Sequence, residues 1–173
     1  MKRLYMIGGP MGVGKTAACR QLQQLLDRSV FLDGDWCWDA HPFQVTEETR
    51  EMVLENIAFL LNNFLRCSAY DHVIFCWVLH RREIWEDLLR RLTEPHVLRA
   101  VSLVCTPEAL RSRLEGDIRA GKRTPDVLDR SLAYLPLYEA LDVRRLDVTD
   151  LTPRETAEQI LKQAAATEKE REP

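Results

Sequence analysis

The sequence predicts an α/β fold, a three-layer sandwich in which a five-stranded parallel sheet is flanked by helices. Short apolar runs alternate along the chain with longer segments whose apolar residues recur at helical spacing. Most of the short runs are apolar throughout, which is typical of strands buried on both faces of a parallel sheet. No internal repeat or low-complexity linker divides the chain, so we expect one layered domain.

The strands are predicted where an apolar run meets a turn or a charged segment. The run from Leu4 to Ile7 ends at two glycines, and the run from Val30 to Leu32 ends at an Asp-Gly-Asp turn. The longest run, from His72 to Leu79, has the composition of a fully buried strand. Two further strands are expected at residues 98–105 and 143–148.

Threonine residues mark three of the expected helix starts. Thr46, Thr106 and Thr152 each precede a helical segment, and a threonine hydroxyl at the N-cap accepts a hydrogen bond from a free backbone amide. Pro107 supports the second start and Glu155, as part of a capping box, the third. Helices are therefore expected at residues 15–28, 46–66, 82–92 and 124–134, and from residues 106 and 152 onward.

Length, charge and cysteine content limit the class of protein. The chain has 173 residues, and its net charge of -3 creates no global field for nucleic acid or an anionic membrane. No apolar run approaches the ~20 residues of a membrane helix. The five cysteines are scattered, so neither a disulfide framework nor a zinc-ligand spacing is expected. We therefore expect a cytoplasmic protein.

A phosphate-binding loop is predicted between the first strand and the first helix, where the pattern G-x-x-x-x-G-K-T is matched in full. Glycines let the backbone turn tightly and point amides at phosphate oxygens, and the helix dipole adds to this attraction. The lysine suits the β and γ phosphates and the threonine hydroxyl suits Mg²⁺, so ATP and Mg²⁺ are the expected ligands; a chance glycine turn is the alternative. The predicted nucleotide-binding residues are Gly9, Pro10, Met11, Gly12, Val13, Gly14, Lys15 and Thr16.

Two carboxylates follow the second strand. In an extended segment Asp33 and Asp35 point the same way, at the edge where open parallel sheets bind ligands. Phosphoryl transfer needs an oriented acceptor hydroxyl and a metal near the γ-phosphate, and two carboxylates could divide these tasks. A turn chosen only for its backbone geometry is the alternative. The position one helix and one strand after the loop favours a functional pair.

These segments resemble the small-molecule kinases of the P-loop NTPase superfamily, whose fold is nucleotide-kinase-like. The glycine-rich loop, the segment from Phe31 to Asp35 and the dipeptide His41-Pro42 are similar to those of gluconate kinase and adenylylsulfate kinase, and shikimate kinase has a related acidic pair. The resemblance implies that Asp35 contacts the acceptor hydroxyl and acts as a base. It also implies that Asp33 and Thr16 support Mg²⁺.

Basic residues crowd the segment between the fourth and fifth predicted strands. Related kinases have a mobile lid there, whose arginines close over ATP. The resemblance implies that Arg113 flanks the adenine and that Arg119 or Arg123 reaches the phosphates; a solvated helix face is the alternative for each arginine. The domain is expected to span residues 1–167, with a lid at about 116–131 and a charged tail at 168–173.

Aromatic residues gather where an acceptor pocket is expected. Trp36, Trp38 and Phe43 follow the acidic turn, and stacked aromatics suit a flat ring or a sugar face. Packing of this loop against the core is the equal alternative. The tryptophans depart from gluconate kinase and adenylylsulfate kinase, so the substrates of those enzymes are not transferred to this chain. His80 and Arg81, just past the third strand, could bind a polar or anionic acceptor.

The residues favour an ATP-dependent phosphotransferase that acts on a hydroxyl of a small molecule, with Lys15, Asp35 and Arg123 as catalytic residues. A nucleoside or nucleotide kinase is one alternative, and a nucleotide-binding regulatory module is another. The chain lacks the N-K-x-D motif of GTPases and the acidic strand end of AAA-type motors, although assignment to a small AAA-type ATPase family is also compatible with the loop. The expected partner is an aromatic or sugar-like acceptor, with no nucleic acid or membrane, in a monomer or homodimer.

Overall fold

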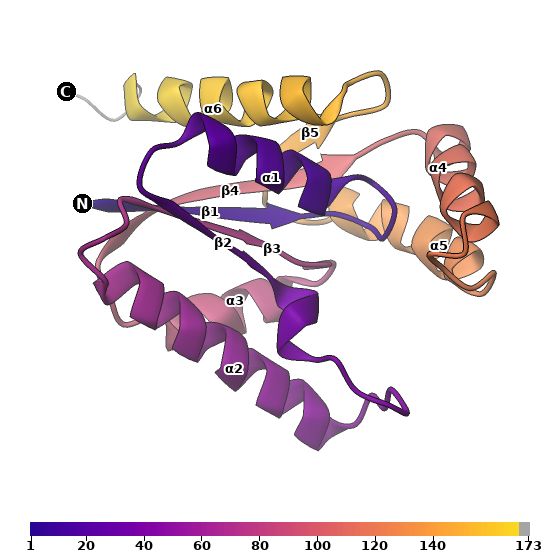
Figure 1. Cartoon of the computed structure of the whole chain (residues 1–173), viewed down its shortest axis with the longest axis horizontal. Coiled ribbons are helices and arrows are strands. Elements are labelled where there is room, and N and C mark those ends of the chain that lie inside the picture. The colour runs from indigo at the N-terminus through magenta and orange to yellow at the C-terminus, as the bar shows by residue number, and fades with distance from the viewer. Residues whose placement is uncertain (170–173) are drawn as a thin grey trace.

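The parallel sheet forms the middle layer of the protein. The computed structural model describes residues 1–169, which contain a five-stranded sheet in the order β2-β3-β1-β4-β5, with every neighbouring pair parallel (Figure 1). This confirms the predicted fold class. The strands are β1 Lys2–Gly8, β2 Ser29–Asp33, β3 His72–Cys76, β4 His96–Val104 and β5 Arg145–Asp147.

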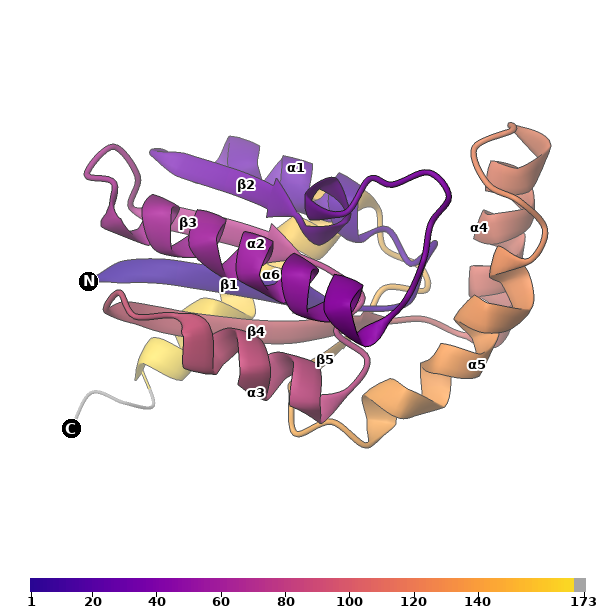
Figure 2. The ribbon, with the colours of Figure 1, turned by 90° about the horizontal axis from the view of Figure 1, so that it is seen from below.

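Helices cover both faces of the sheet, and a further pair stands at its carboxyl edge (Figures 1 and 2). On one face lie α1 Lys15–Leu25 and α6 Pro153–Lys169, and on the other lie α2 Glu47–Arg66 and α3 Arg82–Arg91. The pair at the edge is α4 Pro107–Arg119 and α5 Val127–Glu139. Among the described residues, no helix is long and apolar enough to cross a membrane.

Successive residues of the central strand serve two hydrophobic cores. Leu4 and Met6 pack into the core under α2 and α3, whereas Tyr5 and Ile7 pack into the core under α1 and α6. Side chains of a strand alternate between the faces of its sheet, so a strand covered on both faces must be apolar at every position. This is the physical reason for the continuous apolar runs in the sequence.

The third strand is shorter than the predicted segment 72–79. It ends at Cys76, which pairs with Asp33, the last residue of β2. Beyond Asp33 the chain turns into a 3-10 helix at Gly34–Cys37, so β3 loses its partner on that side. Residues 77–79 are therefore loop, and this loop enters the functional site.

The helix boundaries follow the predicted starts more closely than the predicted ends. Thr46 caps α2 through a reciprocal pair of hydrogen bonds with Thr49, and Thr152 forms the capping box with Glu155. The helix predicted at 15–28 stops at Leu25, and the one predicted at 124–134 instead spans 127–139. Of the tail expected at 168–173, the first two residues belong to α6, and residues 170–173 lie outside the described part.

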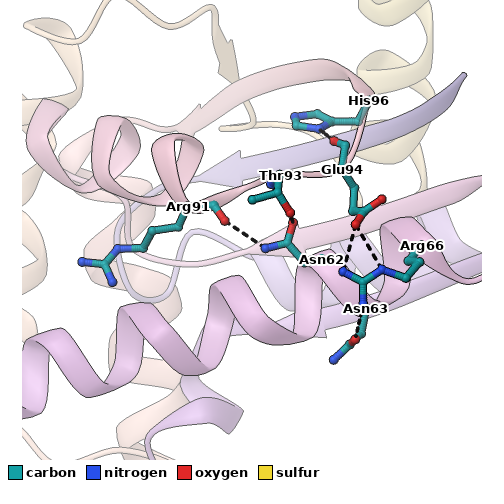
Figure 3. Close-up of polar contacts among 7 residues, drawn as sticks. All are labelled: Asn62, Asn63, Arg66, Arg91, Thr93, Glu94 and His96. Carbon is teal, nitrogen blue, oxygen red and sulfur yellow. Dashed lines mark hydrogen bonds and ion pairs between the residues drawn. The ribbon is translucent and has the colours of Figure 1, made fainter.

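Polar side chains near the end of α2 bind the connection between α3 and β4 (Figure 3). The Asn62 amide donates to the carbonyl of Arg91 at 2.9 Å, and its oxygen accepts from the backbone amide of Thr93 at 2.9 Å. Arg66 adds an ion pair of 2.8 Å with Glu94. Because Asn62 forms hydrogen bonds with two backbone groups of this connection, it fixes the position of α2 relative to the start of β4.

Replacing Asn62 should destabilise the fold without touching the site. We expect Asn62→Ala to lower the free energy of unfolding by about 1–3 kcal/mol, because it removes two hydrogen bonds to backbone groups, each worth about 0.5–1.5 kcal/mol. The neighbouring variant Asn63→Ala is the control, since Asn63 only accepts a 3.4 Å hydrogen bond from Arg66. Urea unfolding followed by tryptophan fluorescence measures both variants, and equal effects would contradict the assignment.

Candidate functional site

The loop between β1 and α1 presents the amino end of a helix without a side-chain cap. Gly14 occupies the N-cap position with φ 105°, a left-handed conformation that glycine adopts without strain. No side chain of the loop accepts a hydrogen bond from the first amides of α1. These amides have no partner inside the helix, and together with the helix dipole they form a site for an anion.

The ammonium group of Lys15 lies across this loop. Its Nζ atom donates to the carbonyl oxygens of Gly9 and Pro10, at 2.8 and 2.9 Å. Burial lowers the pKa of Lys15, and the nearby carboxylates of Asp35 and Asp33 act in the opposite direction. Lys15 and the loop glycines Gly12 and Gly14 line the same cavity, and their role in binding phosphate stays a prediction.

The carboxylate of Asp33 is shared between two elements. One of its oxygens accepts from the Thr16 hydroxyl at 2.7 Å, and the other accepts from the Asp35 backbone amide at 3.1 Å. The second bond caps the 3-10 helix that follows β2, so the segment is not extended as the sequence analysis assumed. Both Asp33 and Asp35 nevertheless line the cavity.

Trp77 supports Asp35, a role that the sequence did not reveal. The indole Nε1 of Trp77 donates to the Asp35 carboxylate at 3.1 Å. A Cβ atom on Gly34 would lie 2.5 Å from the Trp77 ring, so the glycine of the Asp-Gly-Asp turn is required by close packing. The one available signal was a tryptophan near the end of an apolar run, which was interpreted as part of a strand.

The environment of Asp35 favours proton uptake. Partial burial in the cavity wall and the charge of Asp33 raise the pKa of Asp35, in that order. Lys15 and the hydrogen bond from Trp77 lower the pKa in opposition. A carboxylate whose pKa is raised is a better proton acceptor, and such groups concentrate at functional sites.

Magnesium would find oxygen ligands beside the loop. Mg²⁺ in phosphate sites is held by one or two protein oxygens and completes its shell with water and phosphate. The Thr16 hydroxyl and the Asp33 carboxylate lie 2.7 Å apart and fit this description. Within residues 1–169 there is no cluster of three or more His, Cys, Asp or Glu side chains that could hold a metal without such help.

A cavity of about 1670 Å³ extends from the loop across the carboxyl edge of the sheet. Its lining includes Lys15, Thr16, Asp33 and Asp35. The helices α4 and α5 contribute one wall, and α2 and α3 contribute the other. Ligand pockets in proteins are commonly about 300–1000 Å³, so this volume exceeds the need of one small ligand.

The predicted lid arginines occupy different positions. Arg113 lines the cavity and donates to the carbonyls of Val13, Val148 and Thr149, at 3.0, 2.7 and 3.0 Å. Arg123 also lines the cavity, with its Nε 3.2 Å from Asp117. Arg119 is exposed at the end of α4 and lies outside the cavity lining.

The aromatic residues of the acceptor loop separate into two groups. Trp38 and Phe43 line the cavity with their rings 4.6 Å apart, whereas Trp36 packs on Phe31 at 5.2 Å, outside the lining. His80 and Arg81 do line the cavity, as the strand-end argument suggested.

Residues from the opposite wall complete the cavity. Tyr134 of α5 stacks on His80 at 4.3 Å, and a further arginine of α5, Arg130, lines the same wall. Neither the His80–Tyr134 stack nor the contribution of α2 to the lining could be read from the sequence.

Comparison with known proteins agrees with this architecture. A family model described as "AAA domain" matches residues 6–130, and no curated protein matches the chain significantly. The tunicamycin resistance protein of Deinococcus radiodurans is 20% identical, with a TM-score of 0.68 over 95% of this chain and 96% of that one. A gluconokinase from Sinorhizobium meliloti is 17% identical, with a TM-score of 0.68 over 98% of both chains.

A third similar structure contains ligands. The APS kinase of Mycobacterium tuberculosis, in complex with AMPPNP and APS, is 14% identical, with a TM-score of 0.62 over 95% of this chain and 97% of that one. At such identities the likeness establishes the fold, which these proteins share with the present chain.

Removing the indole donor should shift the titration of Asp35. We expect Trp77→Phe to raise the pKa of Asp35 further, because the lost hydrogen bond favoured the charged carboxylate. A carbon-13 NMR titration of the carboxyl groups measures the change. Trp36→Phe is the control, since the Trp36 ring packs on Phe31 and lies outside the cavity lining. An unchanged or lowered pKa in Trp77→Phe would contradict this account.

A methyl group at Gly34 should displace Trp77. We expect Gly34→Ala to cost about 1–3 kcal/mol of stability and to change the NMR shift of the Trp77 indole proton, because the ring must move. Gly116→Ala is the matched control, since no atom lies within 4 Å of a Cβ at that helical position. That variant should be neutral or stabilising by up to about 1 kcal/mol.

Proposed function

The chain belongs to the AAA domain family, and from that premise we propose that it is an ATP-dependent phosphotransferase acting on a hydroxyl of a small molecule. One observation carries the proposal. A phosphate-binding loop and a supported carboxylate with a raised pKa line the same cavity, which has room for a second ligand. Transfer to a hydroxyl uses such a carboxylate to orient the hydroxyl and accept its proton.

The donor end would hold the triphosphate. The free amides of α1 would bind phosphate oxygens, and Lys15 would exchange the carbonyls of Gly9 and Pro10 for the β and γ phosphates. Thr16 and Asp33 would hold Mg²⁺, which neutralises phosphate charge when bound. Arg113 is fixed by three backbone carbonyls and would support the adenine from the rim.

Asp35 would act on the acceptor. The acceptor hydroxyl oxygen forms a bond to the γ-phosphorus, the bond between that phosphorus and the bridging oxygen breaks, and the hydroxyl proton passes to Asp35. ADP leaves with the electron pair of the broken bond. Trp77 keeps the carboxylate oriented, because its indole N–H donates a hydrogen bond to one of the two carboxylate oxygens.

The segment at about 116–131 would serve as a lid of the single domain at 1–167. Arg123 and Lys122 share Asp117 as an ion-pair partner, at 3.2 and 4.0 Å. These exposed pairs are weak, so a triphosphate could compete for both cations. Arg123 would then neutralise charge on the transferred group. Arg119 would contribute only if the lid moved, since it lies outside the cavity lining.

The remaining expectations complete the proposal. Buried thiols such as Cys19, Cys76 and Cys105 are compatible with a reducing compartment, which supports a cytoplasmic location. The partner would be a small-molecule acceptor rather than nucleic acid or membrane, with the protein a monomer or homodimer. Trp38 and Phe43 could stack on a nucleobase, so a nucleoside is an alternative acceptor for the same transfer reaction.

Two variants test the proposed division of labour. We expect Lys15→Ala to reduce transfer by more than about 100-fold through loss of phosphate binding. Asp35→Asn should retain Mg·ATP affinity within about threefold while transfer falls at least about 100-fold. Titration calorimetry measures affinity, and phosphorus NMR of ATP incubated with a panel of sugars, cyclic alcohols and nucleosides measures transfer.

Matched controls separate these effects from general surface changes. Lys162→Ala and Asp39→Asn alter exposed residues outside the cavity and should leave both readouts unchanged. Full transfer by Asp35→Asn would remove that residue from the role of base. Tight Mg·ATP binding with no phosphorylated product across the panel would count against a phosphotransferase.

A further inference from the structure

The part of the cavity beyond Asp35 is lined by apolar side chains and carboxylates. We infer that the acceptor is a bulky alcohol with an apolar body and no anionic group. This inference rests on the proposed function and assigns the substrate class to the same site. Three observations support it: the side chains on the acceptor wall, which is made by α2, α3 and the loops before them; the ion pairs of that wall; and the capping of the helix amino ends beside it.

The acceptor wall is rich in large apolar surface. Phe43 is 57% exposed and Val45 is 52% exposed, although both line the cavity. Large apolar side chains that line a cavity while exposed to solvent mark surface that a ligand can cover. The other apolar members of this wall are Trp38, Val53, Leu54, Trp77 and Ile84.

Charged side chains of opposite sign line different walls of the cavity. The wall made by α4, α5 and the turn between them is basic, with Arg113, Lys122, Arg123 and Arg130 against Asp117. The wall made by α2, α3 and the loops before them is acidic, with Glu47, Glu48, Glu51, Glu83 and Asp87 against Arg50 and Arg81. The basic wall suits a triphosphate, and the acidic wall repels a carboxylate, phosphate or sulfate on the acceptor.

Ion pairs neutralise only part of the acidic wall. Glu51 pairs with Arg91 at 2.7 Å, and Asp87 pairs with Arg90 at 2.8 Å. In the described part of the chain, Glu47, Glu48 and Glu83 form no ion pair, and neither do Arg50 and Arg81, so the wall keeps a small excess of negative charge.

The helix end that could have bound an anion is already satisfied. The amino end of α2 faces the cavity, but its amide at Thr49 donates to the Thr46 side chain. Glu47 and Glu48 occupy its first turn and compensate the helix dipole themselves. An anionic acceptor would therefore have to displace a capping box and approach two carboxylates.

Two arginines of this wall, Arg50 and Arg81, form no ion pair in the described part of the chain and are the rival binding sites for an anion. Arg81 precedes α3, whose amino end has no side-chain cap, and it lines the cavity next to His80. Burial and the charge of Arg81 lower the pKa of His80, so the imidazole adds no positive charge at neutral pH. Arg81, with Arg50 on the same wall, is thus a residue that an anionic acceptor would use.

Four small alcohols separate the contributions of bulk and charge. 1-Phenylethane-1,2-diol is the neutral aromatic probe, 2-amino-1-phenylethanol carries an ammonium group instead, mandelate carries a carboxylate, and glycerol lacks the ring. Each is titrated into the full chain with Mg·AMPPNP and followed by saturation-transfer NMR. We expect the diol and the amine to bind at least about tenfold more tightly than mandelate and glycerol.

Three variants assign the preference to residues. Phe43→Ala should weaken binding of the diol at least about threefold and leave the affinity for AMPPNP unchanged. The double variant Glu47→Gln, Glu48→Gln should reduce the ratio of diol affinity to mandelate affinity at least about threefold. Glu55→Gln, on the same helix but outside the cavity lining, should leave every affinity unchanged.

Several results would overturn the inference. Mandelate or glycerol binding as tightly as the diol would be such a result. So would the absence of binding by all four probes at about 20 mM, a concentration about 100-fold above the dissociation constant of a strong fragment. Loss of mandelate binding in Arg81→Ala would then locate an anion site at α3. The binding order is independent of turnover, so failure of ATP-dependent phosphorylation with the expected order intact would count against the phosphotransferase alone.

Discussion

The positive charge of Lys15 has to be balanced inside a site that also holds two carboxylates, and the surrounding contacts follow from this constraint. Lys15 donates to two loop carbonyls, Asp33 accepts from Thr16 and a backbone amide, and Asp35 accepts from Trp77. Each charged group therefore has polar partners before any ligand arrives. A site organised in advance loses little free energy to rearrangement when phosphate binds.

The strand order brings these groups together. Because β1 lies between β3 and β4, the loop that follows it meets the segments leaving both neighbours at one edge of the sheet. β2 adds the acidic turn from the far side of β3. Helices on either side then give the cavity a basic wall and an acidic, apolar wall. The polarity of the cavity is thus a consequence of which helices follow which strands.

The sequence patterns were reliable where a local physical cause acts alone. Thr46, Thr106 and Thr152 each accept a hydrogen bond at the start of a helix, for reasons contained in a few neighbouring residues. They were misleading where a distant partner decides. Trp77 was assigned to a strand because its neighbours are apolar, yet the end of β2 leaves it in a loop.

What the sequence by itself determined is the layered α/β fold and the phosphate-binding end of the site, because periodicity and capping are local. Only the tertiary structure decided which aromatic residue reaches the cavity: Trp38 lines it, whereas Trp36 packs on Phe31. It also decided that Trp77 holds Asp35 and that Arg119 lies apart. Such contacts join residues up to 42 positions apart, and no spacing along the chain encodes the distance between them.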